Sequence, residues 1–225
     1  MNERILMIET STESCSAAIS CGAGILASRI DETPRRQSAM LAPYIKEVLD
    51  EAGITASELD AVAVSEGPGS YTGLRVGVST AKGICFGACK PLLGVDTLQI
   101  LALQAEIPAE RIVSMIDARR MEVYCATFDT KGTKLDGTEA KILDEDSFRE
   151  LLDAGTVLFI GTGAEKFQAV CHHPNARFQS CHPLATAMAA PALAQLQKKE
   201  FKDVAYFEPF YLKDFVAGIS KKSVL

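Results

Sequence analysis

The segment that decides the fold lies in the middle of the chain and reads RIVSMIDARRMEVYCATF, residues 111–128. It repeats the pattern at the opening of the chain, where residues 5–20 read ILMIETSTESCSAAIS. In both copies an apolar strand ends on an acid, a short polar turn follows, and a second strand returns. Repetition of a whole hairpin unit predicts two similar halves with a cleft between them. We place these halves at residues 1–105 and 106–225.

The residues around each copy predict alternating strands and helices. In the first half we expect strands near 5–8, 15–20, 25–30, 60–65 and 91–95, and helices over 38–52, from the glycine-rich turn to about residue 87, and from 97 to 104. In the second half we expect a helix near 147–153, a strand over 156–160, a turn at 161–163 and an alanine-rich helix after Pro183. The last segment is expected to pack back on the first half. The predicted class is α/β.

Composition excludes several classes of function. The 225 residues include 29 acidic and 23 basic side chains, for a formal net charge of −6. DNA or RNA affinity rests on clustered Lys and Arg that neutralise phosphates, so nucleic-acid binding without a partner is disfavoured. The seven cysteines include no Cys-x-x-Cys pair, and no apolar run approaches the roughly 18 residues of a membrane span. We expect a reduced, cytoplasmic protein with no membrane partner.

A glycine-rich turn, GPGSYTGLRVG at residues 67–77, lies between a predicted strand and a predicted helix. Backbone N–H groups at such a helix start can hold a phosphate. The spacing nevertheless matches neither common nucleotide fingerprint, because Leu74-Arg75 stands where a Walker loop needs Lys-Ser/Thr and Thr72 stands where a dinucleotide loop needs Gly. The spacing therefore favours a tight turn with close helix packing.

Charged residues at the two predicted hairpin turns allow two interpretations. Glu9 and Asp117 could hold a magnesium–nucleotide complex between the halves or act as acid and base, or they could simply bond nearby backbone amides. Arg119 and Arg120 at the second turn suit a phosphate or a partner's carboxylates, and equally suit plain solvation.

A short segment of the second half carries several side chains of the kinds that bind zinc. They are Cys171, His172, His173, Cys181 and His182. Neighbouring residues seldom bind one ion together, and the gap between the two cysteines is long. We expect no metal site here.

Taken together, these motifs resemble the TsaB (YeaZ) family, the non-catalytic paralogue of TsaD in the bacterial machinery that makes threonylcarbamoyladenosine in tRNA. The specific part of the resemblance is residues 67–75, and residues 5–11, 117–124, 161–164 and 209–213 look like weaker family motifs. The resemblance covers nearly the whole chain. It implies the acetate-kinase/Hsp70/actin-like (ribonuclease H-like) duplicated fold, which agrees with the repeat.

The helix predicted to follow the glycine-rich turn is called the signature helix. The region after it is also similar to catalytic TsaD, where an Asn-His-x-x-x-His motif binds the metal. Thr97 and Leu101 occupy the two histidine positions in this chain. A hydroxyl and an isobutyl group cannot replace two imidazoles on one face of a helix. The resemblance therefore implies a subunit that binds no metal, has no catalytic residue and is not itself an enzyme.

The function implied by the resemblance is that of a scaffold subunit. It would bind a TsaD-like catalyst and, with a TsaE-like ATPase, support transfer of threonylcarbamoyl to adenosine next to the anticodon of tRNA. Alone it would form a homodimer, and it would meet tRNA only through the complex. No cofactor is required, and weak ATP or ADP binding is left open.

A second hypothesis belongs to a different functional class. It is a small ATP-dependent phosphotransferase or nucleotide-binding protein of the same fold. Its nucleotide would lie in the cleft near Glu9, Ser11, Asp117, Gly161 and Gly163.

We expect the partner surface on the two long helices of the first half. On the signature helix, residues at spacings of four, three, four and four form a mostly small stripe: Gly73, Gly77, Thr80, Ile84 and Ala88. On the helix over 38–52, Met40 and Tyr44 lie beside the core stripe. Two helices with two apolar faces each can pair with their equivalents in a paralogue as a four-helix bundle. The alternative is that both stripes are buried within the monomer.

Overall fold

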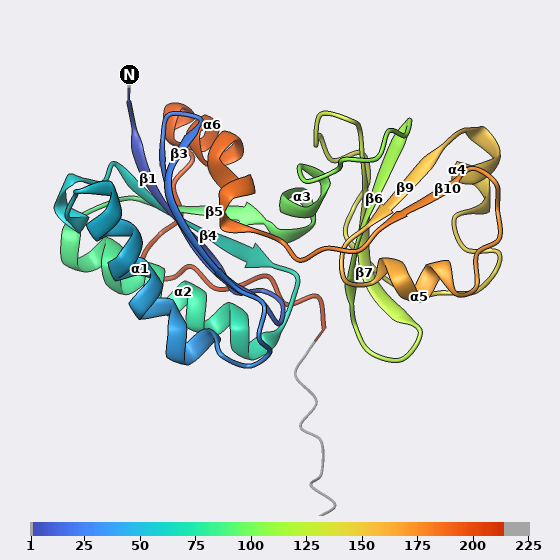
Figure 1. The fold of residues 1–225 in the computed structure, drawn as a ribbon, viewed down its shortest axis with the longest axis horizontal. Helices are drawn as coiled ribbons and strands as arrows, with labels where there is room; N and C mark the ends of the chain where they lie inside the picture. Colours follow the sequence, from blue (N-terminus) through green and yellow to red (C-terminus); the bar gives the residue numbers. More distant parts are fainter. Residues whose placement is uncertain (1, 214–225) are drawn as a thin grey trace, which may run out of the picture.

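Two five-stranded sheets, one in each half, form the frame of the molecule in the computed structural model, which describes residues 2–213 (Figure 1). For residues 214–225, the expectation that the last segment packs back on the first half lies outside the described residues. The first sheet has the order β3-β2-β1-β4-β5 and contains β1 (Arg4–Glu9), β2 (Cys15–Cys21), β3 (Gly24–Asp31), β4 (Ala61–Gly67) and β5 (Leu92–Asp96). The second has the order β10-β9-β6-β7-β8 and contains β6 (Arg111–Asp117), β7 (Glu122–Phe128), β8 (Glu139–Ile142), β9 (Val157–Ile160) and β10 (Ala176–Gln179).

The strand pairings confirm the internal repeat. β1 pairs antiparallel with β2 and parallel with β4, and β6 pairs antiparallel with β7 and parallel with β9. The outer strands follow the same rule, since β3 and β8 continue the antiparallel side and β5 and β10 the parallel side. The two halves therefore share one topology.

The helices of the first half cover both faces of its sheet. Alternate residues of a strand point to opposite faces. Leu6 and Ile8 of β1 pack in the cluster that contains Leu41 and Val48 of α1 (Gln37–Ala52) and buried residues of α2 (Tyr71–Ala88). Ile5 and Met7 pack instead against the segment formed by η2 (Ala185–Met188) and α6 (Ala189–Lys198), whose Ala185, Met188, Ala189 and Ala192 are buried there.

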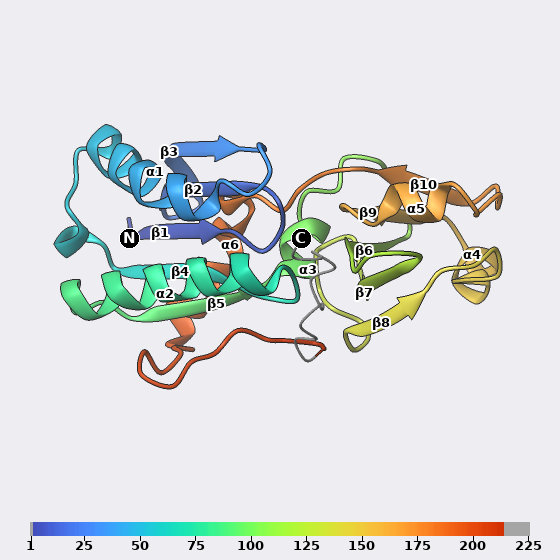
Figure 2. The ribbon, with the colours of Figure 1, turned by 90° about the horizontal axis from the view of Figure 1, so that it is seen from below.

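The second half has the same strands but much shorter helices. The connections equivalent to α1 and α2 are α4 (Arg149–Ala154) and α5 (Ala164–Gln168), of six and five residues. The long helices α1 and α2 have 16 and 18 residues. Figure 2 shows the long pair side by side across the first half. Any surface built from two long parallel helices therefore belongs to the first half.

The chain returns to the first half after β10. Within residues 2–213, the segment formed by η2 and α6 lies on the first sheet, and the last strand of the second sheet ends at Gln179. Beyond α6, Lys202 pairs with Leu92 at the free edge of β5, and the Phe210 N–H donates to the Glu66 carbonyl at 2.6 Å. We call residues 202–213 the return segment; Lys213 at its end donates to Glu122 of β7 at 2.5 Å.

Helix α3 (Thr97–Ala102) joins the halves. Asp96 caps it by accepting from the Leu98 N–H at 2.8 Å. Leu98, Leu101 and Ala102 pack with the second sheet, whereas Ile100 packs with the first. The Lys134–Asp96 ion pair, at 2.7 Å, adds a polar link between the halves.

Most of the predicted elements are present, with particular differences. Gly53 adopts the left-handed cap conformation after α1, at φ 66°. α1 begins at Gln37, one residue before the predicted start at residue 38. Sequence analysis did not predict four short elements: β8, α5, β10 and the 3-10 turn η1 (Ala56–Glu58). Among residues 2–213 no helix has the length and apolar character needed to cross a membrane.

Two glycines of α2 are expected to respond in opposite ways to the same substitution. A Cβ atom at Gly73 would overlap the carbonyl oxygen of Thr10, whereas one at Gly83 would meet nothing within 4 Å. We expect Gly73→Ala to lower the free energy of unfolding by about 2 kcal/mol or more through overpacking against backbone. Gly83→Ala should raise it by about 0.5–1 kcal/mol, because alanine restricts the unfolded chain and suits a helix. Urea denaturation of both variants checks this, and equal effects would contradict the packing described here.

Candidate functional site

The glycine-rich turn at residues 67–77 packs directly on the first hairpin turn. The Ser70 N–H donates to the Ser11 carbonyl at 2.6 Å, and the Thr10 hydroxyl donates to the Gly73 carbonyl at 2.7 Å. Cβ atoms at Gly69, Gly73 and Gly77 would overlap atoms of Ser11 or Thr10. Backbone N–H groups at the start of α2 donate to acceptors within the protein itself; for example, the Gly73 N–H donates to the Ser70 hydroxyl at 3.3 Å. This geometry agrees with the structural interpretation of the motif.

Two of the predicted nucleotide residues, Glu9 and Ser11, are buried beneath this turn. The Ser11 N–H donates to Glu9 Oε1 at 2.5 Å, whereas Glu9 Oε2 and the Ser11 hydroxyl have no partner among the described residues. On the opposite side, the His182 ring lies 3.3 Å from the Thr12 hydroxyl, and the Ala185 N–H donates to Ser16. The chain itself thus closes the first hairpin turn, and Glu9 and Ser11 are fully buried in this conformation. Their role in nucleotide binding stays a prediction.

The other three predicted nucleotide residues meet in the second half. The exposed Asp117 accepts from Lys166 Nζ at 2.7 Å, and its backbone N–H donates to the Thr162 hydroxyl at 3.0 Å. A Cβ at Gly161 would overlap the Met115 carbonyl, and one at Gly163 would lie 2.7 Å from Val123. These glycines let the turn after β9 approach β6 closely, as Gly69 and Gly73 do in the first half. Weak ATP or ADP binding stays a prediction.

The positions that carry histidines in TsaD-type motifs lie in the junction between the halves. Thr97 and Leu101 are both buried on α3. Leu101 packs with Ile116 and Leu158 of the second sheet. It also lies close to Gly161, because a Cβ atom added there would be only 2.8 Å from Leu101 Cδ1. Leu101 therefore serves packing between the halves, whereas Thr97 is buried with no hydrogen-bond partner for its hydroxyl among the described residues.

The five cysteine and histidine residues considered for zinc do not converge. The His173 ring contacts Asp153 at 3.3 Å in the second half, whereas His182 contacts Thr12 in the first. Cys171 packs in the core of the second half. Across residues 2–213 no three His, Cys, Asp or Glu side chains are grouped so that they could hold a metal.

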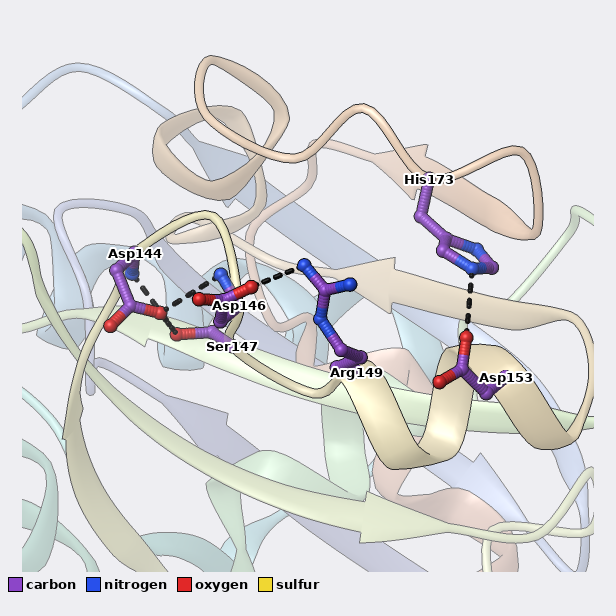
Figure 3. A network of polar contacts seen from close by, with 6 residues as sticks. All are labelled: Asp144, Asp146, Ser147, Arg149, Asp153 and His173. Atoms are coloured by element: carbon purple, nitrogen blue, oxygen red, sulfur yellow. Dashed lines mark hydrogen bonds and ion pairs between the residues drawn. The ribbon is translucent and has the colours of Figure 1, made fainter.

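The larger of two hollows described here, about 770 Å³, lies in the second half and is lined by acidic side chains around α4. Figure 3 shows the polar contacts on this side. Ser147 donates to Asp144 at 2.7 Å and thereby lowers the pKa of that carboxyl, and Arg149 pairs with Asp146. Asp144 and Asp146 bond residues of their own loop and helix and order the entry to α4, whereas Asp153 contacts His173 of the loop before β10.

Burial also leaves four of the seven thiols without nucleophilic character. It raises the pKa of Cys15 and Cys125 to about 12 and that of Cys85 and Cys181 to about 11. A nucleophilic cysteine needs the opposite shift.

The structure corrects the predicted partner stripe on α2. Gly73 and Gly77 face Thr10 and are buried, so they cannot contact a partner. Thr80, Ile84 and Ala88 are half-buried, as are Met40 and Tyr44 of α1. Tyr44 donates to Asp31 at 3.3 Å, and the Thr80 hydroxyl donates to the Val76 carbonyl.

The outer side of α2 carries residues that sequence analysis missed. The Phe86 side chain is 83% exposed, and Cβ atoms at Gly83 and Gly87 would meet nothing within 4 Å. The sequence signal for this side was a phenylalanine between two glycines, at helix positions outside the set that faces the core of the first half. We call Thr80, Gly83, Phe86 and Gly87 of α2, with Met40 and Tyr44 of α1, the helix face.

Comparison with known proteins agrees with this architecture. The family model described as "TsaD: tRNA N6-adenosine threonylcarbamoyltransferase" matches residues 25–221. The chain is 30% identical to the Escherichia coli tRNA threonylcarbamoyladenosine biosynthesis protein TsaB over 95% of this chain and 96% of that one. A Pseudomonas aeruginosa structure, described as similar to peptidase YeaZ, superposes with a TM-score of 0.84 at 30% identity, over 94% of this chain and all of the other. An activator of 2-hydroxyisocaproyl-CoA dehydratase from Clostridium difficile shares the fold alone, with a TM-score of 0.50 at 10% identity over 89% and 98% of the two chains.

The duplicated sheets and the junction at α3 define an α/β protein of the acetate-kinase, Hsp70 and actin class. Within this class, both the sequence match and the superposition cover nearly the whole chain. The chain therefore belongs to the TsaB (YeaZ) family, the paralogues of TsaD.

Burial raises the pKa of Glu9 from 4.5 to about 7, which links stability to pH. Below pH 4.5 the carboxyl is protonated in both states. Between pH 4.5 and 7 the unfolded chain loses this proton and the folded chain keeps it, so the free energy of unfolding falls as pH rises, by roughly 3 kcal/mol in total. Glu9→Gln mimics the protonated form. We expect this variant to match the parent protein near pH 4.5 and to be more stable at pH 8.

Denaturant titrations of both proteins from pH 4.5 to 8 check this linkage. All other titrating groups are common to the two proteins, so their difference isolates Glu9. A difference that does not change with pH would show that Glu9 titrates normally.

Proposed function

We propose that this chain is a scaffold subunit that binds a TsaD-like catalyst and supports transfer of threonylcarbamoyl to adenosine next to the anticodon of tRNA. The observation that carries the proposal is the helix face. Its Phe86 side chain is 83% exposed, and the space around the neighbouring Gly83 and Gly87 is open. Exposed aromatic anchors are typical of protein interfaces, and glycines let a second helix approach closely.

A paralogue is the partner that suits this face. The inner sides of α1 and α2 are buried on the first sheet, so their outer sides are available for a second pair of helices. A paralogue of the same topology presents an equivalent pair, and two pairs form a four-helix bundle. A second copy of the chain offers the same pair, which supports a homodimer in the absence of the catalyst.

The chain would contribute no catalytic residue. Thr97 and Leu101 are buried at the junction between the halves, and burial raises the pKa of Cys15, Cys85, Cys125 and Cys181. The metal and the transfer chemistry would belong to the catalyst, and a TsaE-like ATPase would complete the complex. Such a complex would meet tRNA in the cytoplasm, where reducing conditions suit the free cysteines.

Charges placed on the helix face should abolish association with a TsaD-like partner. Gly83→Arg and Tyr44→Asp would bury unpaired charges in a dry helix contact, which costs several kcal/mol. Each should weaken binding at least about 100-fold in titration calorimetry. Gly83→Arg should leave the melting temperature within a few degrees, whereas Tyr44→Asp also loses the hydrogen bond to Asp31 and should melt at a lower temperature. Gln168→Arg, which changes an exposed residue of α5, is the control and should bind normally. Wild-type affinity of both helix variants would place the interface elsewhere.

Threonylcarbamoylation of tRNA should require this chain and its catalytic partner together. The reconstitution contains tRNA, threonine, bicarbonate, ATP and the adenylate-forming enzyme, with modified adenosine measured by mass spectrometry. We expect product only when both proteins and the ATPase are present, because Thr97 and Leu101 cannot bind a metal. Product formed without the TsaD-like protein would sink the scaffold proposal.

A further inference from the structure

The turn between β6 and β7 presents two arginines whose guanidinium groups have no partner among residues 2–213. Arg119 and Arg120 are both exposed, and neither guanidinium forms an ion pair or hydrogen bond within the described part of the chain. The turn is closed by the Ala118 N–H to the Glu122 carbonyl at 3.0 Å and by the Glu122 N–H to the Arg119 carbonyl at 3.1 Å. The backbone holds both side chains at the tip of the hairpin.

The acids beside these arginines are neutralised by other cations. Asp117 accepts from Lys166 Nζ at 2.7 Å and from the Arg119 backbone N–H at 2.6 Å. Glu122 accepts from Lys213 Nζ at 2.5 Å. Lysines from α5 and from the return segment thus hold the two carboxylates, and both segments lie on the same side as this turn (Figure 1). The tip carries a local positive charge on a chain of net charge −6.

The backbone at the tip is strained in a way that arginine does not relieve. Arg119 and Arg120 have φ values of 73° and 50°, in the left-handed region that glycine and asparagine adopt far more readily. Strain at exposed residues without structural partners is commonly found where a side chain serves binding. Neither packing nor an ion pair accounts for two arginines here.

We infer that this turn contacts the phosphate backbone of tRNA in the assembled complex. Guanidinium groups match phosphate oxygens in a bidentate geometry, and they keep their charge at all physiological pH values. The helix face assigned to the protein partner lies in the first half, whereas the turn belongs to the second, so the turn is free for a different ligand. The inference rests on the proposed function, because it requires tRNA to be the substrate of the complex.

The test compares three versions of this chain in complex with the TsaD-like catalyst and the ATPase. The first is the parent protein, and the second is the double variant Arg119→Asn with Arg120→Gly, whose residues suit left-handed backbone. The third, Arg111→Ala, removes an exposed arginine at the opposite end of β6. Filter binding of unmodified tRNA at several KCl concentrations gives the dissociation constant and its salt slope. Size-exclusion chromatography without RNA reports complex formation, and thermal melting reports stability.

We expect the double variant to bind tRNA roughly tenfold more weakly at low salt and to reduce the salt slope by about one per lost phosphate contact. Its melting temperature should be unchanged or higher, and it should assemble normally. Arg111→Ala should match the parent protein. A double change to lysine, Arg119→Lys with Arg120→Lys, retains the charge and should keep most of the salt slope.

Three outcomes would overturn the inference. Unchanged tRNA affinity and salt slope in the double variant would show that the turn does not meet phosphate. Loss of assembly without RNA would show that the arginines contact carboxylates of a protein partner. If the parent chain itself formed no complex with the catalyst, the proposed function would fail and this inference with it.

Discussion

The contact on which the first half depends is between two stretches of backbone. The start of α2 lies so close to residues 10–11 that a side chain at Gly69 or Gly73 would overlap a carbonyl oxygen. Two hydrogen bonds, Ser70 to Ser11 and Thr10 to Gly73, fix this approach. Because α2 starts there, its core stripe meets β1 and β4, and α1 packs beside it. The second half uses the same device, since Gly161 and Gly163 bring the turn after β9 onto Met115.

The duplication preserved the sheets and not the helices. Five strands pair in the same order in both halves, yet the segments equivalent to α1 and α2 are only one or two turns long. A short helix cannot cover a sheet face and also present an outer side to a partner. The division of labour follows from this difference: the first half supplies a broad helix face, and the second supplies loops and a charged hairpin tip.

The sequence was a sufficient guide to the strands and long helices, because their periods and the repeat are local or self-confirming patterns. It failed for β8 and β10, which have four residues each and mixed polarity. It also misplaced the stripe on α2. A small residue on a helix has the same spacing whether it faces a partner or its own chain, and only the position of Thr10 shows that Gly73 and Gly77 face inward. The contacts of the first hairpin turn with residues 182–185 come from far along the chain, and no local pattern around this turn could reveal them.

The return of the chain after β10 has a consequence for biosynthesis. One face of the first sheet is covered by Ala185, Met188, Ala189 and Ala192, so the core of the first half is incomplete until those residues have left the ribosome. The second half, by contrast, is continuous from residue 111 to residue 179. All five strands of the first half, up to Asp96, are synthesised before the second half begins, but the segment that covers one face of its sheet is synthesised after β10. The second half therefore has its complete core available before the first half does.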